Sequence, residues 1–208
     1  MSFKNPFEVS YDRLPEALSV LPLDAILLLP GGQIPLQVFE PRYINMVQDA
    51  LATPERVIGV ILPKDKNSLY TIGCAGRITS FEETADGRFL ITLTGYCRFK
   101  TINELSTMRG YRLFSVDWSL YKNDLVIDSN PDIHRDELVK LIQKYSQQLG
   151  IHMDWEVLSI TPNFNVITFF SMSLPFKHSN KQPLLEAHTL EDRGEVLMAM
   201  IKDEIAAG

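Results

Sequence analysis

Short apolar runs separated by turn signals fill the first part of the chain, and helical spacing of apolar residues fills the rest. The runs that predict strands lie at residues 26–29, 34–39, 57–62, 72–84, 88–102 and 111–118. Pro30-Gly31-Gly32 predicts a turn between the first two runs. Pro41 precedes a helical pattern, and proline suits the first helical position because its missing N–H has no partner there. Strands followed by helices are typical of the α+β class. We therefore predict a β-rich subdomain over residues 1–125 and a helical subdomain over residues 126–208.

The two longest runs flank Asp86-Gly87 and predict a β-hairpin whose two central residues both have positive φ. In the second run, apolar residues take every second position from Phe89 to Phe99, which predicts one strand face on a core. The intervening positions, including Arg98, are predicted to face away from that core. Gly95 lies in the middle of the run and indicates a bulge or a sharp bend, as in a barrel-like sheet.

Helical spacing begins near residue 130. The segments that predict helices lie at residues 138–149, 166–172, 182–187 and 190–205. The segment 128–131 supplies a cap and a proline before the first of these helices, and Gly150 closes it. Thr189 and Asp192 form a capping box before the last helix. Gly194 inside that helix indicates that another element packs closely against it.

Composition narrows the class of protein. The 208 residues include 20 Lys and Arg and 26 Asp and Glu, for a net charge of −6. A mildly acidic chain has no bulk attraction for nucleic acid or anionic lipid. Its two cysteines are too few for a disulfide framework, and the N-terminus lacks the pattern of a secretory signal. No apolar stretch approaches the ~20 residues that span a bilayer. We therefore expect a reduced, soluble, cytoplasmic protein that binds no membrane.

One segment carries a family resemblance. Residues 21–47 read LPLDAILLLPGGQIPLQVFEPRYINMV, with a Pro-Gly turn before the block Phe39-Glu40-Pro41-Arg42-Tyr43. This segment resembles the N-terminal domain of the Lon protease family, and later pieces such as residues 87–100 extend the resemblance from about residue 18 to about residue 203. The resemblance implies a PUA-like antiparallel β-barrel or sheet with one inserted helix, followed by a helical bundle. It also implies a role in contacting protein substrates or partners.

The chain departs from full-length Lon proteases. It contains no Gly-Lys dipeptide, so it has no G-x-x-x-x-G-K-[ST] phosphate loop. We also expect no protease module after residue 205. The resemblance therefore implies a stand-alone recognition domain without the ATPase and serine–lysine protease modules. We expect a protein that is not an enzyme and needs no cofactor. We expect it to bind unfolded proteins or partner proteins in a groove between its two halves. The sequence leaves its oligomeric state open.

The Phe39–Tyr43 block has two interpretations. In the structural one it is a strand-to-helix corner, in which Glu40 accepts N–H bonds at the helix start and Arg42 pairs with a carboxylate. In the functional one it is part of a peptide-contact surface, because aromatic and arginine side chains suit such anchors. On this basis the candidate binding residues are Phe39, Glu40, Arg42 and Tyr43.

The sequence predicts no catalytic residue and no metal site. Cys74 and Cys97 lie on apolar strand faces, where free cysteine behaves as a small hydrophobe, whereas a nucleophile would need exposure and a nearby base. No H-x-x-x-H or C-x-x-C spacing supports a zinc site for the histidines, which are His134, His152, His178 and His188. No G-x-S-x-G elbow supports serine catalysis at Ser80, Ser106 or Ser115.

The alternative function is an RNA-binding PUA-like module, which the family resemblance keeps open. A basic patch for it would come from Lys64, Lys66, Arg98, Lys100 and Arg109. The competing interpretation of these residues is a solvated strand face, because RNA-stacking motifs are missing and the chain is acidic. Four methionines either fill the core or line an adaptable groove, namely Met153, Met172, Met198 and Met200.

Overall fold

The computed structural model describes residues 10–126 and 133–207. The chain divides into two compact units, residues 1–127 and 128–208. Each unit is described by itself. The cap predicted at residues 128–131 lies outside the described residues.

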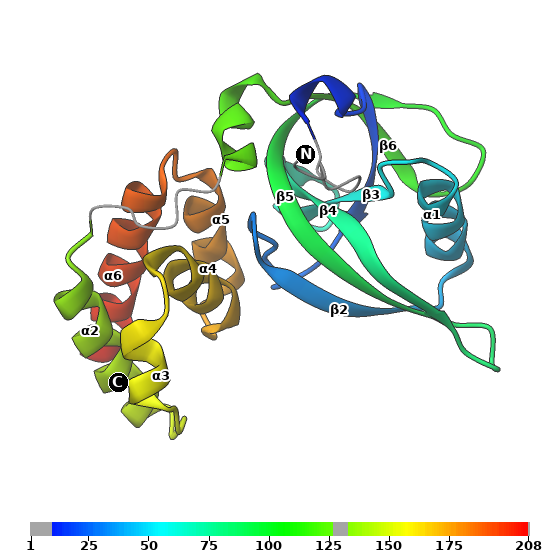
Figure 1. Cartoon of the computed structure of the whole chain (residues 1–208). Helices are drawn as coiled ribbons and strands as arrows, with labels where there is room; N and C mark the ends of the chain where they lie inside the picture. Colours follow the sequence, from blue (N-terminus) through cyan, green and yellow to red (C-terminus); the bar gives the residue numbers. More distant parts are fainter. Residues whose placement is uncertain (1–9, 127–132, 208) are drawn as a thin grey trace, which may run out of the picture. The chain divides into compact units, whose positions relative to one another are not determined.

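The first unit is built on a sheet whose described strands follow the order β2-β5-β4-β3-β1-β6 (Figure 1). These strands are β1 (Ala17–Pro22), β2 (Gln33–Val38), β3 (Val57–Pro63), β4 (Leu69–Glu83), β5 (Phe89–Leu105) and β6 (Arg112–Asp117). Strands β1 and β3 run parallel, and the other pairs are antiparallel. The far half of β5 also pairs with β6, so the sheet curls back on itself. The predicted α+β class is confirmed, and the predicted antiparallel barrel or sheet is a curled mixed sheet rather than a closed antiparallel barrel.

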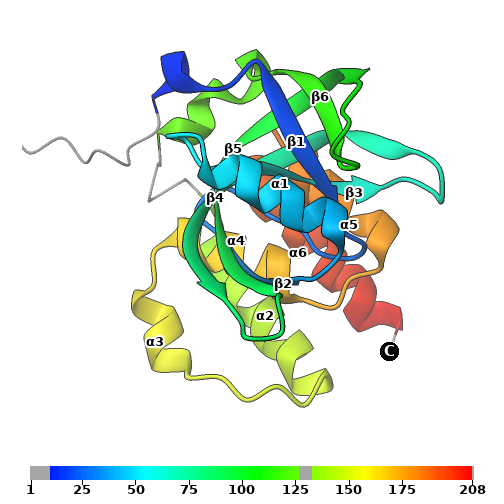
Figure 2. The ribbon, with the colours of Figure 1, turned by 90° about the vertical axis from the view of Figure 1, so that its right-hand side faces the viewer.

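Among residues 10–126, three helical segments accompany the sheet: η1 (Tyr11–Arg13), α1 (Pro41–Leu51) and η2 (Ser119–Leu125). Helix α1 begins at Pro41, as predicted, and buries Met46, Val47 and Ala50. It lies across β1 and β3 (Figure 2). Segment η2 packs on β5. Within residues 10–126 and 133–207, none of the helices combines the length and apolar character that crossing a lipid bilayer demands.

The apolar run at residues 26–29 is not a strand, so that prediction is wrong. Leu27, Leu28 and Leu29 are buried within a loop, and the first strand is β1 instead. A Cβ added at Gly76 or Gly95 would meet atoms of Leu28 within 3.1 Å, which places this leucine on the glycine backbones of β4 and β5. The run is apolar because it fills space over the sheet, not because it pairs with a neighbouring strand.

Gly95 is required by this loop. A Cβ at Gly95 would lie 2.2 Å from the carbonyl oxygen of Leu29. The Gly31 N–H donates to the Gly95 carbonyl at 2.8 Å, and the Gly95 N–H donates to the Gly32 carbonyl at 2.9 Å. The predicted bulge is confirmed, because Ala75 pairs with Cys97 while Gly76 pairs with Gly95, which leaves Tyr96 as the extra residue.

The β4–β5 hairpin is confirmed, but its turn differs from the prediction. Gly87 has φ 80°, whereas Asp86 is not among the residues with positive φ. The Thr84 N–H donates to the Arg88 carbonyl, and the Gly87 N–H donates to the Thr84 carbonyl, both at 2.9 Å. The loop therefore has three residues, and such loops need only one left-handed position.

The second unit consists of helices. They are α2 (Arg135–Gln148), α3 (Trp155–Ile160), α4 (Asn163–Ser173), α5 (His178–Glu186) and α6 (Leu190–Ala207). Helices α2, α4 and α5 pack against α6. The predicted capping box is confirmed, since Thr189 Oγ1 accepts from the Asp192 N–H and Asp192 Oδ2 accepts from the Thr189 N–H, both at 3.0 Å. Gly194 packs closely, as predicted, because an added Cβ would lie 3.3 Å from Ile167.

Candidate functional site

The predicted binding residues lie where β2 passes into α1. The Glu40 carbonyl accepts the N–H groups of Tyr43 and Ile44, both at 2.9 Å, but the Glu40 carboxylate caps no backbone N–H of the helix. Instead, Glu40 Oε2 accepts from Arg42 Nε at 2.9 Å and lies 2.8 Å from Arg42 Nη2. The predicted carboxylate cap is therefore wrong. The reason is that the Arg42 guanidinium, two residues away, binds the same carboxylate with a full charge.

Arg42 also lies over the Tyr43 ring, with its guanidinium carbon 4.5 Å from the ring centroid. Tyr43 is half-buried, and this burial raises the pKa of its hydroxyl. Glu40, Arg42 and Tyr43 thus contact one another in series. Phe39 stands apart from them: 64% of it is exposed. Of the four candidates, Phe39 is the one that offers a large apolar surface to another molecule.

A mixed apolar and polar surface lies on three strands of the sheet, one of which, β2, ends at Val38 directly before Phe39. Its members are exposed or partly exposed residues of three adjacent strands, and we call it the sheet-face patch: Pro35, Gln37, Ser80, Glu82, Leu90 and Thr92. The strand register arranges them in two rows, because Thr92 pairs with both Pro35 and Ser80, and Leu90 pairs with both Gln37 and Glu82. Directly opposite residues point to the same face of a sheet. The patch is therefore one continuous face of β2, β5 and β4.

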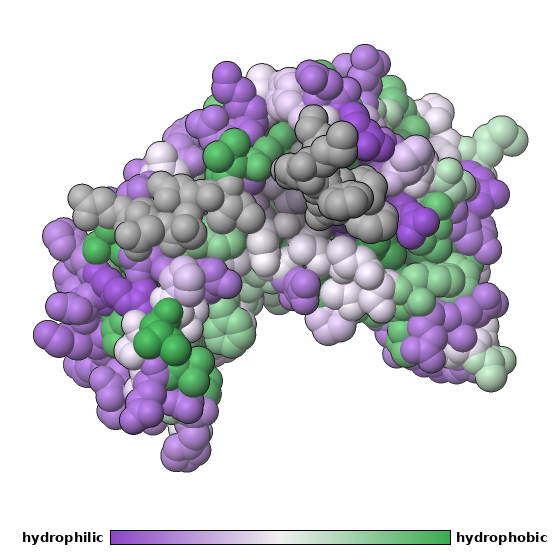
Figure 3. All heavy atoms as spheres, in the orientation of Figure 1, coloured by the Kyte–Doolittle hydropathy of each residue, from purple (hydrophilic) through white to green (hydrophobic). Residues whose placement is uncertain are grey.

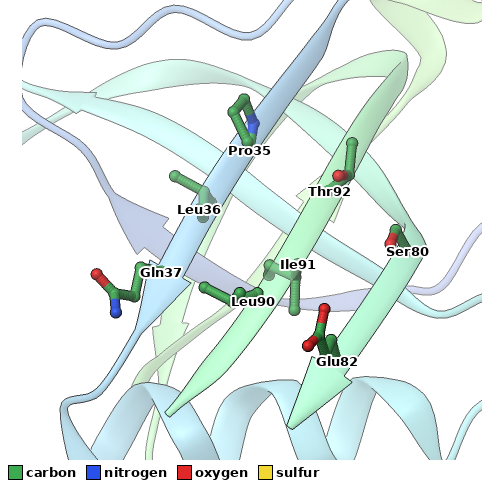
Figure 4. A pocket seen from close by; sticks show the side chains of 8 residues that line it. All are labelled: Pro35, Leu36, Gln37, Ser80, Glu82, Leu90, Ile91 and Thr92. Atoms are coloured by element: carbon green, nitrogen blue, oxygen red, sulfur yellow. The ribbon is translucent and has the colours of Figure 1, made fainter. Parts of the chain in front are cut away.

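The patch surrounds a shallow depression of about 380 Å³, which Leu36 and Ile91 also line (Figure 4). Leu90 is 38% exposed there. Glu82 is the one charged residue among those that line the depression. A surface of this kind offers apolar contact area and hydrogen-bonding groups to another molecule.

Two of the five cations of the alternative basic patch, Arg98 and Arg109, form ion pairs with carboxylates. Arg98 is 2% exposed, so the prediction that it faces solvent is wrong. Its Nε and Nη2 donate to Asp124 at 2.8 and 2.7 Å, and its guanidinium lies 4.1 Å from the centroid of the Tyr121 ring. Segment η2 packs on β5 and supplies both partners, Asp124 and Tyr121. Arg109 is paired with Asp49, at 3.1 Å.

The cysteines are core residues. Cys74 and Cys97 are both buried. Burial, followed by the nearby Asp124 carboxylate, raises the pKa of Cys97 to about 12. The Cys97 thiol donates to the Tyr121 carbonyl at 3.5 Å. A thiolate nucleophile at Cys97 is therefore disfavoured at neutral pH.

Metal ligands do not gather in the described ranges. Within these residues, no three side chains of His, Cys, Asp or Glu come together in a way that would hold a metal ion. The backbone of His178 lies in α5, but its side chain is outside the described part of the structure. Met198 is buried in the helical unit, and Met153, Met172 and Met200 are partly buried.

Comparison with known proteins identifies the family. Residues 17–203 match the model of the ATP-dependent protease La (LON) substrate-binding domain. The chain belongs to this family. The predicted resemblance is therefore confirmed, and it covers nearly the whole chain.

Curated relatives of this Lon domain are much longer proteins. The Lon protease of Anaeromyxobacter dehalogenans is 23% identical over 206 residues, which cover 94% of this chain and 24% of that protein. The Lon protease of Flavobacterium johnsoniae is 25% identical over 197 residues, which cover 89% of this chain and 24% of that protein. The chain thus spans about a quarter of the length of the curated relatives it matches.

Solved structures share the fold of this Lon domain. The Lon N-terminal domain protein from Xanthomonas campestris is 25% identical, with a TM-score of 0.66, over 88% of this chain and 97% of that one. The N-terminal domain of the Mycobacterium avium complex Lon protease is 16% identical, with a TM-score of 0.64, over 90% of this chain and 98% of that one. The second likeness establishes the fold alone.

Sequence reasoning missed the sheet-face patch of this Lon domain, although one signal was present. Leu90 is an apolar residue at a position of β5 where the alternation calls for a polar one.

A second apolar surface was also missed. Helix α3 exposes Val157 by 56% and Ile160 by 83%, three residues apart on one helix face, and Figure 3 shows apolar side chains gathered over this helix.

Proposed function

We propose that this chain binds protein substrates or partner proteins and catalyses no reaction itself. The observation that carries the proposal is the match of residues 17–203 to the Lon substrate-binding domain family. The lack of a Gly-Lys dipeptide in the sequence is consistent with a chain that binds no nucleotide through a phosphate loop. We propose the cytoplasm as the compartment of this protein, because the two free cysteines of the chain would stay reduced there.

We place recognition at the sheet-face patch together with Phe39. This surface combines an exposed aromatic ring with Leu90 and Pro35, so an apolar segment of another protein would bury area against it. Burial contributes about 25 cal/mol per Å², from which the cost of ordering the bound segment must be subtracted. Affinities of about micromolar strength are therefore expected. The groove predicted between the two halves stays a prediction.

The experiment is a binding titration with an unfolded probe. Reduced, carboxymethylated α-lactalbumin carrying a fluorophore would be titrated with the wild-type chain, with Leu90→Asp and with Leu105→Asp. Leu105 is the matched control, because it lies on the same strand and is also 38% exposed. Leu90→Asp is expected to weaken binding by about tenfold, whereas Leu105→Asp leaves it within about twofold.

Two results would refute this proposal. One is that the wild-type chain binds neither unfolded nor folded proteins. The other is that the purified chain hydrolyses ATP or cleaves a polypeptide. Equal binding by the wild type and Leu90→Asp would move the site away from the patch but leave the binding function intact.

The RNA-binding alternative has little support from the described residues. Of the five cations proposed for it, Arg98 is buried against Asp124 and Arg109 is paired with Asp49. A gel shift with a mixed RNA pool at low salt tests it directly. Salt-dependent retention of RNA would revive this alternative, because phosphate contacts weaken as salt rises.

A further inference from the structure

Strand β2 ends the strand order of the sheet. It pairs with β5 over its whole length, from the pair Gln33 and Thr94 to the pair Val38 and Phe89. In the described part of the chain no strand pairs with its other edge. An unpaired edge presents a row of main-chain N–H and C=O groups, which is a template for another extended segment.

The register shows which groups face the free edge. In an antiparallel ladder, alternate residues direct both their N–H and C=O toward the same neighbour. The Gly95 N–H donates to the Gly32 carbonyl, so this carbonyl is directed at β5, although the Gly32 N–H donates to Leu29 in the preceding turn. Ile34, Leu36 and Val38 follow Gly32 in the alternation and are directed at β5. The residues directed at the free edge are therefore Gln33, Pro35 and Gln37.

Pro35 fits this assignment, because proline in a sheet is confined to positions where its missing N–H costs no ladder bond. The edge then offers two N–H donors, at Gln33 and Gln37, and three carbonyl acceptors. Pro35 leaves the middle without a donor, which weakens pairing with a second β2 strand but still allows two hydrogen-bonded positions.

The side chains along this edge carry no charge. Strand β2 reads QIPLQV, whereas natural edge strands are often protected by charged residues, lysine above all. The exposed side chains of Pro35 and Gln37 belong to the sheet-face patch, and the exposed ring of Phe39 follows them in the chain. A segment added to this edge would place every second side chain on the same face as the patch.

We propose that an extended segment of a substrate protein adds to the free edge of β2 as a further strand and packs its alternate apolar side chains beside Pro35 and Gln37. This inference rests on the proposed function and specifies its substrate class: uncharged or weakly charged extended segments recognised through their main chain. Main-chain recognition tolerates many sequences, because each residue supplies the same N–H and C=O groups.

The test separates the main chain of the edge from its side chains. The variant Gln33→Pro removes one of the two edge donors, and the matched control Gln33→Ala removes the side chain of this residue, which lies outside the sheet-face patch, but keeps its N–H group. The probe is a short synthetic peptide with alternating valine and threonine, a single lysine and blocked ends. The proline variant is expected to bind it about tenfold more weakly, and the alanine variant within about twofold of the wild type.

A second measurement needs no variant. Amide hydrogen exchange of Gln33 and Gln37 in the wild-type chain is expected to slow by about tenfold or more when the peptide is bound, because both N–H groups become hydrogen-bonded. This readout decides the proposal even if the proline variant does not fold.

The following outcomes would overturn the edge proposal. A folded proline variant that binds the peptide as well as the wild type would do so, as would unchanged exchange at Gln33 and Gln37 with the peptide bound. Protection that appears without peptide and grows with protein concentration would assign the edge to a second copy of this chain. If the wild-type chain still binds unfolded protein in these cases, only the edge proposal fails. If it binds none, the proposed function fails as well.

Discussion

Asp124 accepts three hydrogen bonds from Arg98. The main-chain N–H of Arg98 donates at 2.9 Å, and its Nε and Nη2 donate at 2.8 and 2.7 Å. The two side chains are only 3% and 10% exposed. The pair attaches η2 to β5, and η2 lies at the end of the first unit. The two charges therefore compensate each other in a place that is largely shielded from solvent.

Removing one partner of this pair is expected to cost much more than removing a surface pair. Asp124→Leu should lower the free energy of unfolding by about 3 kcal/mol or more, because it removes the carboxylate that accepts three hydrogen bonds from the buried Arg98. The pair of Arg112 and Glu104 is the control, since it has similar distances but is 35% and 48% exposed. Glu104→Gln should cost about 1 kcal/mol or less. Urea unfolding measures both, and equal losses would contradict the prediction.

Gly95→Ala is expected to be among the most damaging small substitutions. The added Cβ would lie 2.2 Å from the Leu29 carbonyl oxygen. Because this oxygen is a backbone atom, no side-chain rotation can relieve the clash. We expect a loss of about 3 kcal/mol. Gly87→Ala is the control, because Gly87 has φ 80° but nothing within 4 Å of an added Cβ, so it should cost about 1 kcal/mol. Thermal unfolding of both variants tests this order, and a milder Gly95→Ala would refute it.

The thiol of Cys97 is expected to make the free energy of unfolding depend on pH in the alkaline range. Burial raises the pKa of its thiol from 9.0 to about 12 in the folded chain, so the folded state holds this proton more tightly than the unfolded state. The resulting stabilisation is fully present below pH 9.0 and is lost as pH rises toward about 12. Cys97→Ala lacks this contribution. The difference in unfolding free energy between wild type and Cys97→Ala should therefore shrink above pH 9.0, as urea unfolding at several pH values would show. A difference that stays constant with pH would contradict this.

Arg135 ties the end of α3 to the start of α4. Its Nη2 donates to the carbonyls of Leu158 and Thr161 at 2.6 and 2.8 Å, and its Nη1 donates to Asn163. Arg135→Met should lower the unfolding free energy by about 2 kcal/mol, because charged hydrogen bonds to these carbonyls are lost. The exposed pair of Lys202 and Glu137 gives the control, Lys202→Met, which should cost much less. Amide hydrogen exchange in α3 should become faster in Arg135→Met but not in the control Lys202→Met.

Glu82 is expected to influence which peptides the sheet-face patch prefers. It is exposed and is the one charged residue lining the depression. Glu82→Lys should weaken binding of a lysine-bearing peptide by about threefold and strengthen binding of its glutamate counterpart, both effects fading at high salt. Anisotropy titrations of the two peptides measure this. Identical preferences in wild type and variant would place the peptide away from Glu82.

Local patterns determined much of this protein from the sequence alone. The alternation from Phe89 to Phe99 identified the long strand β5, Pro41 marked the start of α1, and Thr189 with Asp192 marked the start of α6. Each of these signals depends on residues within a few positions of one another. Local backbone geometry is therefore enough to identify the helix or strand from the pattern. The block at Phe39–Tyr43 likewise carried the family resemblance.

Only the tertiary structure decided what the same residues contact across long separations. Arg98 stands at a polar position of its strand, but Asp124, 26 residues later, takes it out of solvent. The run 26–29 has the composition of a strand, but Leu29 instead packs against the backbone of Gly95. The free edge of β2 exists because the strand order ends there. These facts follow from which segments meet in space, and hydrophobic periodicity along the chain carries no information about that pairing.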